Sequence, residues 1–198
     1  MYTEKKYVRE ALPKGTSEKA LAIHQDKLYV GYVKKMNEIA LKLAGVDLAS
    51  ANQSYSDLRS LKDGETFSTN GVYLHEYYFS VLSDSEVLPT GVLLEGITTT
   101  FGSLQRFVEM FSACGMAARG WVVLGWDTHT GALKIYCGDA HNQGGVWGTI
   151  PLLVLDVYEH AYFMDYGSDR KTYITDFMSS INWKPLEEKF EKINKLIV

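Results

Sequence analysis

The sequence predicts an α+β protein: an N-terminal antiparallel helical hairpin, then an α/β part with a three-stranded antiparallel sheet flanked by helices. Apolar residues recur at helical spacing over about residues 17–43 and again over 69–82. From residue 120 the pattern changes to short strand-like runs, and helical spacing returns from residue 162 to 197. This order of helices, strands and helices is typical of the class.

The first two helices each carry a histidine on an apolar stripe. His24 lies in the stretch 17–43, and His75 lies in the stretch 69–82. Thr16 or Ser17 is expected to cap the start of the first helix. Residues 45–68 are polar and are expected to connect the two, with one short helix possible. Helices joined in this way lie antiparallel, so we expect both histidines on the shared side.

A segment rich in acidic residues, Pro and Gly, residues 83–91, is expected to be a linker. We place a boundary there, between an N-terminal helical sub-domain (1–83) and a C-terminal α/β sub-domain (84–198), with the functional site between them. A third helix is expected over about residues 96–116, with an aromatic apolar face.

The strands follow this helix. Residues 120–126 and 132–137 read as a hairpin joined by a five-residue loop, and 149–155 is an apolar run typical of a buried strand. The C-terminal stretch from 162 is helical with a break near residues 182–185. The sequence therefore predicts a small sheet enclosed by helices.

Composition limits the possible partners. The net charge of −4 and the pI near 5.7 argue against nucleic-acid binding, which normally needs a basic face. No stretch approaches the ~20 apolar residues of a membrane span, so we expect no membrane association and a cytoplasmic location. The chain is the right size for one well-cored domain or two small sub-domains.

The two cysteines, Cys114 and Cys137, form no CxxC pair. Neither a disulfide framework nor a thiolate zinc site is therefore indicated. A metal in this chain would be held by nitrogen and oxygen, which points to iron, manganese or zinc.

The strand 149–155 is followed directly by ionisable residues: Asp156, Glu159 and His160. Such groups next to a buried strand must be hydrated, paired or metal-bound. With three other histidines beside apolar runs, His24, His75 and His141, they offer enough ligands for one metal ion. Spacing alone does not bring these residues together, and a core histidine hydrogen-bonded to a neighbour remains the alternative for each.

The motifs around these residues resemble those of the iron/manganese superoxide dismutases. Residues 156–162, Asp-Val-Tyr-Glu-His-Ala-Tyr, are similar to the signature of that family. The stretches around His24 and Tyr32, and residues 70–75 ending in His75, resemble its first two ligand helices in the right order. Gly120-Trp121 and residues 165–183 extend the similarity over nearly the whole chain.

The resemblance implies a set of roles. His24, His75, Asp156 and His160 would bind one iron or manganese ion per subunit, with solvent as a further ligand. Tyr32 would be the tyrosine at the substrate entrance, and Trp121 would be part of the aromatic lining of the site. Glu159 would reach the metal ligand His160 of the partner subunit.

A hydrogen bond to the metal-bound solvent tunes the metal in this family, often through a glutamine. Gly71 stands in one of its two places and offers no side chain for the bond. The resemblance therefore implies His141, from the loop after the hairpin, with Gln143 as the second choice. A histidine in this place gives a slight preference for iron, or for tolerance of both metals.

Two positions depart from the family pattern. Leu28 replaces a histidine near the entrance, and Phe163 replaces its usual tyrosine partner across the interface, so both ends of one polar contact are apolar. The main prediction is an oxidoreductase, a superoxide dismutase with an antioxidant role, assembled as a homodimer or tetramer. The alternative is a metal-binding homologue with weak or no activity. A non-haem iron oxygenase is a further rival, which a third histidine argues against.

Overall fold

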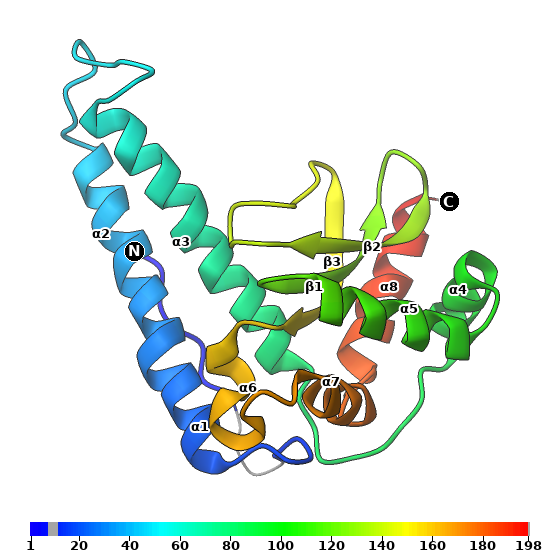
Figure 1. The fold of residues 1–198 in the computed structure, drawn as a ribbon. Helices are drawn as coiled ribbons and strands as arrows, with labels where there is room; N and C mark the ends of the chain where they lie inside the picture. The colour runs from blue at the N-terminus through cyan, green and yellow to red at the C-terminus, as the bar shows by residue number, and fades with distance from the viewer. Residues whose placement is uncertain (8–11, 198) are drawn as a thin grey trace.

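A computed structural model describes residues 1–7 and 12–197 of the 198-residue chain. Helices come first, three strands follow, and helices close the chain (Figure 1). This is the α+β architecture that the sequence predicts. The elements are α1 (Glu18–Ile23), η1 (His24–Tyr29), α2 (Val30–Leu43), α3 (Asp57–Ser80), α4 (Gly91–Phe101), α5 (Leu104–Ala117), β1 (Trp121–Asp127), β2 (Ala132–Gly138), β3 (Thr149–Asp156), α6 (Glu159–Tyr166), α7 (Arg170–Ser179) and α8 (Lys184–Ile197).

The first predicted helix has the expected ends but an irregular middle. Ser17 caps it by accepting a hydrogen bond from the backbone N–H of Ala20 at 3.1 Å. Between α1 and α2, however, η1 is a π-helical turn that begins at His24. The wider turn shifts the buried stripe, so that Tyr29 is fully buried and Leu28 only partly. Regular helical spacing predicts the opposite.

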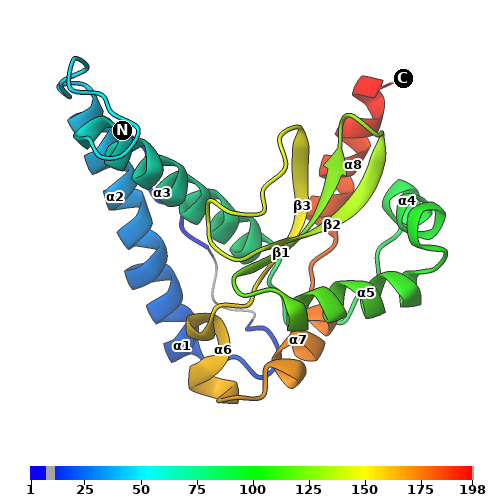
Figure 2. The same cartoon turned by 45° about the horizontal axis from the view of Figure 1, so that its top comes forward.

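The second helix is longer than predicted. It starts at Asp57, where Ser56 accepts a hydrogen bond from the N–H of Arg59, and not near residue 69. α2 and α3 project together beyond the rest of the molecule (Figure 2). Because the first turns of α3 have little protein to cover them, their apolar pattern is weak, and the sequence indicated only a possible short helix in this region.

The third predicted helix is two helices. α4 ends at Gly102, whose φ of 87° lies in the left-handed region that glycine adopts without strain. Ser103 then caps α5 by accepting from the N–H of Arg106 at 3.0 Å. The expected single helix over 96–116 is therefore wrong at this point, because a C-terminal glycine and a new N-cap stand side by side.

The three strands form one antiparallel sheet in the order β2-β1-β3, with the predicted hairpin as β1 and β2. β3 is an edge strand, which accommodates Pro151 opposite an irregularity at Gly125 of β1. On one face Trp126 packs edge-on against Phe190 of α8, at 5.5 Å between ring centroids. On the other side α3 packs against β3.

Pairing within the sheet sets the position of the site. Trp121 at the start of β1 lies opposite Asp156 at the end of β3, and both are buried. The strand end thus faces α3 and η1, while α6 begins three residues further on, at Glu159 (Figure 1). Among the described residues, no helix combines the length and the apolar character needed to cross a membrane.

Candidate metal centre

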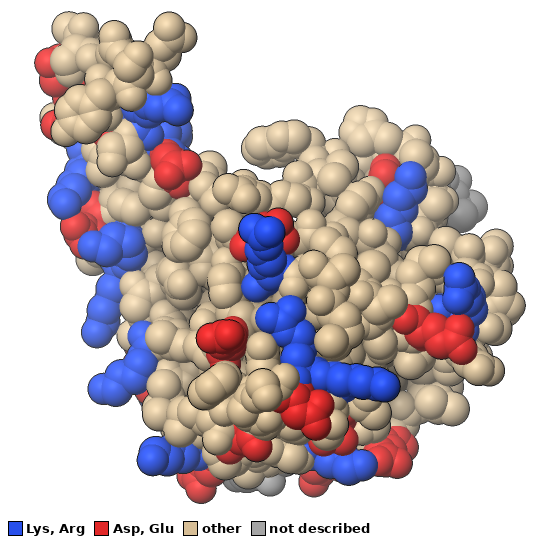
Figure 3. Space-filling view, in the orientation of Figure 1, with Lys and Arg blue, Asp and Glu red and all other residues tan. Residues whose placement is uncertain are grey.

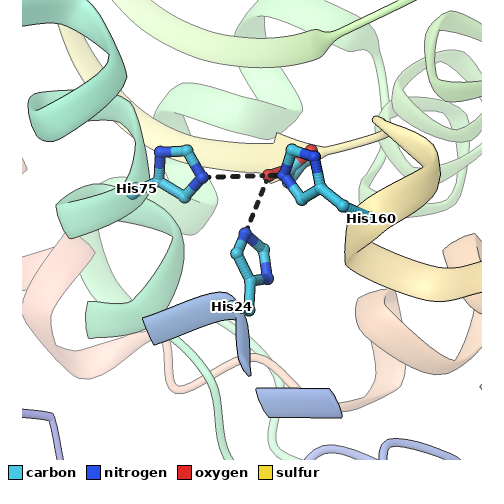
Figure 4. Close-up of side chains that lie close together, drawn as sticks. His24, His75 and His160 are labelled. Carbon is cyan, nitrogen blue, oxygen red and sulfur yellow. Dashed lines mark hydrogen bonds and ion pairs between the residues drawn. The ribbon is translucent and has the colours of Figure 1, made fainter. Parts of the chain in front are cut away.

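Four ionisable side chains from four elements meet where β3 ends. His24 comes from η1, His75 from α3, Asp156 from β3 and His160 from α6. One ligand atom of each lies within 4.8 Å of those of the others. Figure 4 shows the three imidazoles pointing toward the carboxylate from three directions. The first three residues are buried, and 28% of the His160 side chain is exposed.

The Asp156 carboxylate is held by the turn that follows it. Its Oδ1 accepts a hydrogen bond from the backbone N–H of Tyr158 at 2.9 Å, and its backbone carbonyl accepts one from the Tyr173 hydroxyl at 2.7 Å. Oδ2 is left to face the imidazoles. The Nε2 atoms of His24 and His160 lie 3.2 Å from it, and Nε2 of His75 lies 3.6 Å away.

Two of these nitrogens lack a hydrogen-bond partner. Nε2 of His24 and Nε2 of His75 are buried and make no well-aligned hydrogen bond to any described residue, although both face Asp156. A buried polar atom without a partner costs roughly 1–3 kcal/mol, so such atoms are rare unless something else satisfies them. Three imidazole nitrogens and one carboxylate oxygen suit iron, manganese or zinc. The residues therefore fit a bound metal ion.

A backbone contact fixes the orientation of His75. Its Nδ1 lies 2.5 Å from the carbonyl oxygen of Gly71, one helical turn earlier in α3. Because a carbonyl only accepts, Nδ1 carries the proton, and Nε2 presents a lone pair to the site. Metal-binding histidines are commonly held in this way.

The electrostatics of the cluster favour neutral imidazoles on His24 and His75 beside a charged carboxylate. Burial lowers the pKa of His24 and lowers that of His75 to about 3. Burial raises the pKa of Asp156, but the adjacent imidazoles of His160 and His24 outweigh it and hold that pKa well below its usual range. Burial also opposes protonation of His160, yet the hydrogen bond to Asp156 raises its pKa. The unprotonated imidazoles are the form that binds metal.

An aromatic group surrounds the cluster. Tyr32 stacks on His75 with 5.4 Å between ring centroids, and Trp121 meets His75 edge-on at 5.0 Å. Tyr158 stacks on His160 at 5.3 Å. Burial raises the pKa of Tyr32, so its hydroxyl keeps its proton at neutral pH. These rings thus pack against two of the four candidate ligands, His75 and His160.

His141 lies against this group, and Gln143 does not. His141 is 4% exposed and meets Tyr32 edge-on at 4.7 Å, whereas Gln143 is exposed. Nδ1 of His141 accepts a hydrogen bond of 2.9 Å from the indole N–H of Trp121. Burial lowers the pKa of His141 to about 4, so the ring is neutral at pH 7 and its proton sits on Nε2.

The backbone of α3 makes room for these two rings. A Cβ at Gly71 would lie 3.0 Å from the Tyr32 ring and 3.3 Å from Cδ2 of His141. The space that a side chain at position 71 would need is thus occupied by Tyr32 and His141. On the outer side, a groove of about 670 Å³ leads to Trp121 and His141, with Val123 and Tyr136 in its wall.

Sequence reasoning missed several residues that contact the cluster. Phe79 meets His24 edge-on at 4.9 Å, Phe67 lies 4.5 Å from His141 between ring centroids, and Tyr173 bonds the backbone of Asp156. The helical spacing of Phe79 from His75 is the one available signal. The others are aromatic residues of ordinary spacing, which a sequence pattern does not separate from the rest of the core.

Of the two residues that depart from the family pattern, Phe163 lies on α6 one turn after His160, and Leu28 lies in η1. Phe163 on α6 is 55% exposed and its neighbour Met164 is 50% exposed, while Ile23 at the end of α1 is 38% exposed. Glu159 is exposed and Leu28 is half-buried. Ile23 and Phe163 belong to two helices that contact each other, α1 and α6.

The fold and the cluster define a class of protein: an α+β protein whose described residues include three histidines and one aspartate that could hold one metal ion. Comparison with known proteins gives the family. Residues 89–189 match the family described as iron/manganese superoxide dismutases, C-terminal domain. Together with the relatives below, this match shows that the chain belongs to the iron/manganese superoxide dismutase family.

The similar proteins include both metal types. The chain is 43% identical over 185 residues to the superoxide dismutase [Fe] of Aquifex pyrophilus, covering 91% of this chain and 87% of that protein. It is 42% identical to the superoxide dismutase [Fe] of Aquifex aeolicus over the same shares. It is 33% identical to superoxide dismutase [Mn] 1 of Halobacterium salinarum, covering 94% of this chain and 92% of that protein.

Proposed function

We propose that this chain is a superoxide dismutase that holds one iron or manganese ion with His24, His75, Asp156 and His160. The observation that carries the proposal is the pair of buried imidazole nitrogens, on His24 and His75, which face a buried carboxylate without a hydrogen-bond partner among the described residues. Family membership supplies the reaction class.

The reaction converts two superoxide ions and two protons into oxygen and hydrogen peroxide. A bound metal ion, held by His24, His75, Asp156 and His160, would supply the one-electron redox chemistry that this conversion needs. The protein must therefore fix the geometry of its ligands, offset positive charge and deliver protons. Asp156 is buried, and its low pKa keeps it ionised, so it supplies the one protein charge at the cluster.

Two groups are suited to proton delivery. The Tyr32 hydroxyl keeps its proton at neutral pH because burial raises its pKa. His141 is neutral with Nε2 protonated, because its Nδ1 accepts from Trp121. Both rings lie against His75, so we assign Tyr32 and His141 to the proton path and Trp121 to the positioning of His141.

The choice of metal is left to the surroundings of the ligands, because iron and manganese bind the same donors. We assign His141 to the place from which a side chain reaches the metal's solvent ligand in the family, and we base on it a preference for iron, or for use of either metal. The relatives are named for iron in some cases and for manganese in others.

We further propose a homodimer in which Glu159 reaches His160 of the partner subunit. The exposed apolar side chains of Phe163, Met164 and Ile23 support an interface on this side of the molecule. A tetramer would need a second contact surface. We also propose that the chain divides into two sub-domains at residue 83, because each side of this boundary contributes two of the four ligands. We propose a cytoplasmic location as well.

Attraction of an anionic substrate has to be local, because the net charge is −4. Acidic and basic side chains are interspersed on the face seen in Figure 3, with basic groups along the edge formed by α1 and α2. Arg170 is held beside α6 by hydrogen bonds to Tyr162 and to the Ala118 carbonyl.

One assay tests the function and the ligands together. Purified protein is measured for iron and manganese content and for removal of superoxide. We expect about one metal ion per chain and rapid removal of superoxide in the wild type, and loss of both in His75→Ala. His129→Ala is the matched control, because His129 is exposed and outside the cluster.

The same assay decides the alternative. Leu28 and Phe163 remove both ends of one polar contact at the entrance, which favours a metal-binding homologue with little turnover. One metal ion per chain with negligible activity would establish that alternative. Metal retained in His75→Ala would show that the ligand assignment is wrong.

A further inference from the structure

Outside the metal cluster, the chain brings its two cysteines together. Cys114 lies in α5 and Cys137 in β2, and the thiol of Cys137 donates to the backbone carbonyl of Cys114 at 3.8 Å. Both thiols are free. The sequence pattern indicated no disulfide framework, because the two residues are far apart along the chain and belong to no cysteine motif.

The packing of α5 on the sheet explains why they meet. Phe107, Phe111 and Gly115 form the buried side of α5, and Cys114 flanks it one turn after Phe111. Cys137 pairs with Val122 of β1 in the antiparallel register. It is exposed, and Cys114 is half-buried, so small oxidants in solvent reach the pair.

The pKa of Cys137 reflects its surroundings. Burial raises the pKa of Cys137, and the adjacent Cys114 thiol and the Asp139 carboxylate raise it further, to about 11. Cys137 therefore stays protonated at neutral pH and reacts slowly. A slow pair responds to peroxide that accumulates and does not respond to each turnover.

We propose that Cys114 and Cys137 are a peroxide-sensitive pair that closes to an intramolecular disulfide. The inference rests on the proposed function, because hydrogen peroxide is the product of superoxide dismutation. One thiolate attacks the peroxide, the O–O bond breaks, and a sulfenic acid and water form. The second thiol displaces water from that sulfur. In total the two thiols lose two electrons, the peroxide gains them, and two water molecules leave.

The disulfide would fasten the edge of the sheet. β2 pairs only with β1 among the described strands, so its outer side has no strand to hold it. A bond from Cys137 to α5 ties this strand to the helix that packs on it. Closing a loop between positions 114 and 137 restricts the unfolded chain, so the oxidised protein resists unfolding better than the reduced one.

The test uses the metal-loaded protein and hydrogen peroxide added directly. This makes failure of the pair distinguishable from failure of dismutation, since the protein need not produce the oxidant. Free thiols are counted under denaturing conditions, and the intact mass and a non-reducing peptide map are recorded. We expect both thiols to disappear, the mass to fall by two hydrogen atoms, and one peptide to contain Cys114 linked to Cys137.

Single variants provide the controls. Cys114→Ser and Cys137→Ser each leave one thiol, which has no internal partner. We expect the wild type to gain about 5 °C in melting temperature on oxidation, reversed by a dithiol, and neither variant to gain. Sulfinic acid or a disulfide between chains as the main wild-type product, or two unreacted thiols, would overturn the proposal. The peptide map of the wild type tests the proposal even if a variant fails to fold.

Discussion

The indole N–H of Trp121 donates to Nδ1 of His141 over 2.9 Å, and both side chains are buried. The bond determines which nitrogen of His141 carries the proton, because Nδ1 can accept only when it is unprotonated. Nε2 is therefore the donor. A residue at the start of β1 thus controls what a loop histidine offers to the cluster.

Trp121→Phe should lower both stability and activity. It leaves Nδ1 of His141 buried without a donor, which costs about 1–3 kcal/mol in the free energy of unfolding, in addition to lost packing. Superoxide removal should fall several-fold, because the ring is no longer oriented. Denaturant unfolding and the activity assay measure these two effects.

Trp126→Phe is the control for this substitution. The indole nitrogen of Trp126 is buried and makes no hydrogen bond to a described residue, and its ring packs on Phe190 away from the cluster. Its replacement should lose packing alone and leave activity unchanged. Equal losses of activity in the two variants would remove the role we give to the Trp121 bond.

Acidification should destabilise the fold between about pH 6.5 and 4. The folded-state pKa values of His75 and His141 are lowered to about 3 and about 4 by burial, whereas the unfolded chain binds these protons near pH 6.5. The unfolded state therefore holds more protons in this window, and the free energy of unfolding falls as pH falls. His160 acts in the opposite direction, because its pKa is raised.

His141→Gln isolates one of these contributions. The variant retains the cluster, so the difference in pH dependence from the wild type belongs to position 141. The slope of unfolding free energy between pH 6.5 and 4 should become shallower by up to about 1.4 kcal/mol per pH unit. An unchanged slope in denaturant titrations would mean that His141 is not buried as described.

Gly71→Ala should reduce activity with little change in stability. The new methyl group would lie 3.0 Å from the Tyr32 ring and 3.3 Å from His141, so these rings must move. Alanine gains about 1 kcal/mol over glycine in a helix, which offsets the cost of that movement. We expect an unfolding free energy within about 1 kcal/mol of the wild type and a several-fold loss of superoxide removal.

Gly64→Ala offers the comparison in the same helix. A methyl group there would meet only the tip of Ile39, at 3.2 Å, far from the cluster. It should gain the same helical preference and keep full activity. Loss of activity in both variants would point to α3 as a whole and not to the space at position 71.

Glu159→Gln should weaken the proposed dimer. The side chain is exposed, so its loss removes no internal contact that would unfold the chain. Sedimentation equilibrium should show dissociation at a higher protein concentration than in the wild type. Glu188→Gln, also exposed but on α8, should leave the association unchanged. Identical dissociation of both variants would contradict the interface.

Local chemistry made much of the fold predictable. A few adjacent residues are enough to predict the Ser17 cap, the turn between β1 and β2, and the break before α8. The helix break at Gly102 also has a local signal, a glycine followed by serine, and it was missed because the apolar spacing continues across it. The start of α3 had only a weak signal, a possible short helix in the polar connection, because its first turns are poorly covered by the rest of the protein.

The candidate site was also only partly predictable from the sequence. The residue types of His24, His75, Asp156 and His160 are visible in the sequence, and the resemblance to a family orders them, but their meeting within 4.8 Å is a tertiary fact. The hydrogen bond from Tyr173 to the Asp156 carbonyl joins α7 to the end of β3. No periodicity distinguishes that tyrosine from the other core aromatics.

The π-helical turn at His24–Tyr29 sets an angle between two functional side chains. A π turn accommodates one residue more than an α turn, and each α-helical residue corresponds to a rotation of roughly 100°. The extra residue therefore rotates the part of the helix that follows it, and this rotation sets the direction of the Tyr32 side chain relative to His24. Deleting one residue here would regularise the helix and point Tyr32 away from His75, while the helix itself remained.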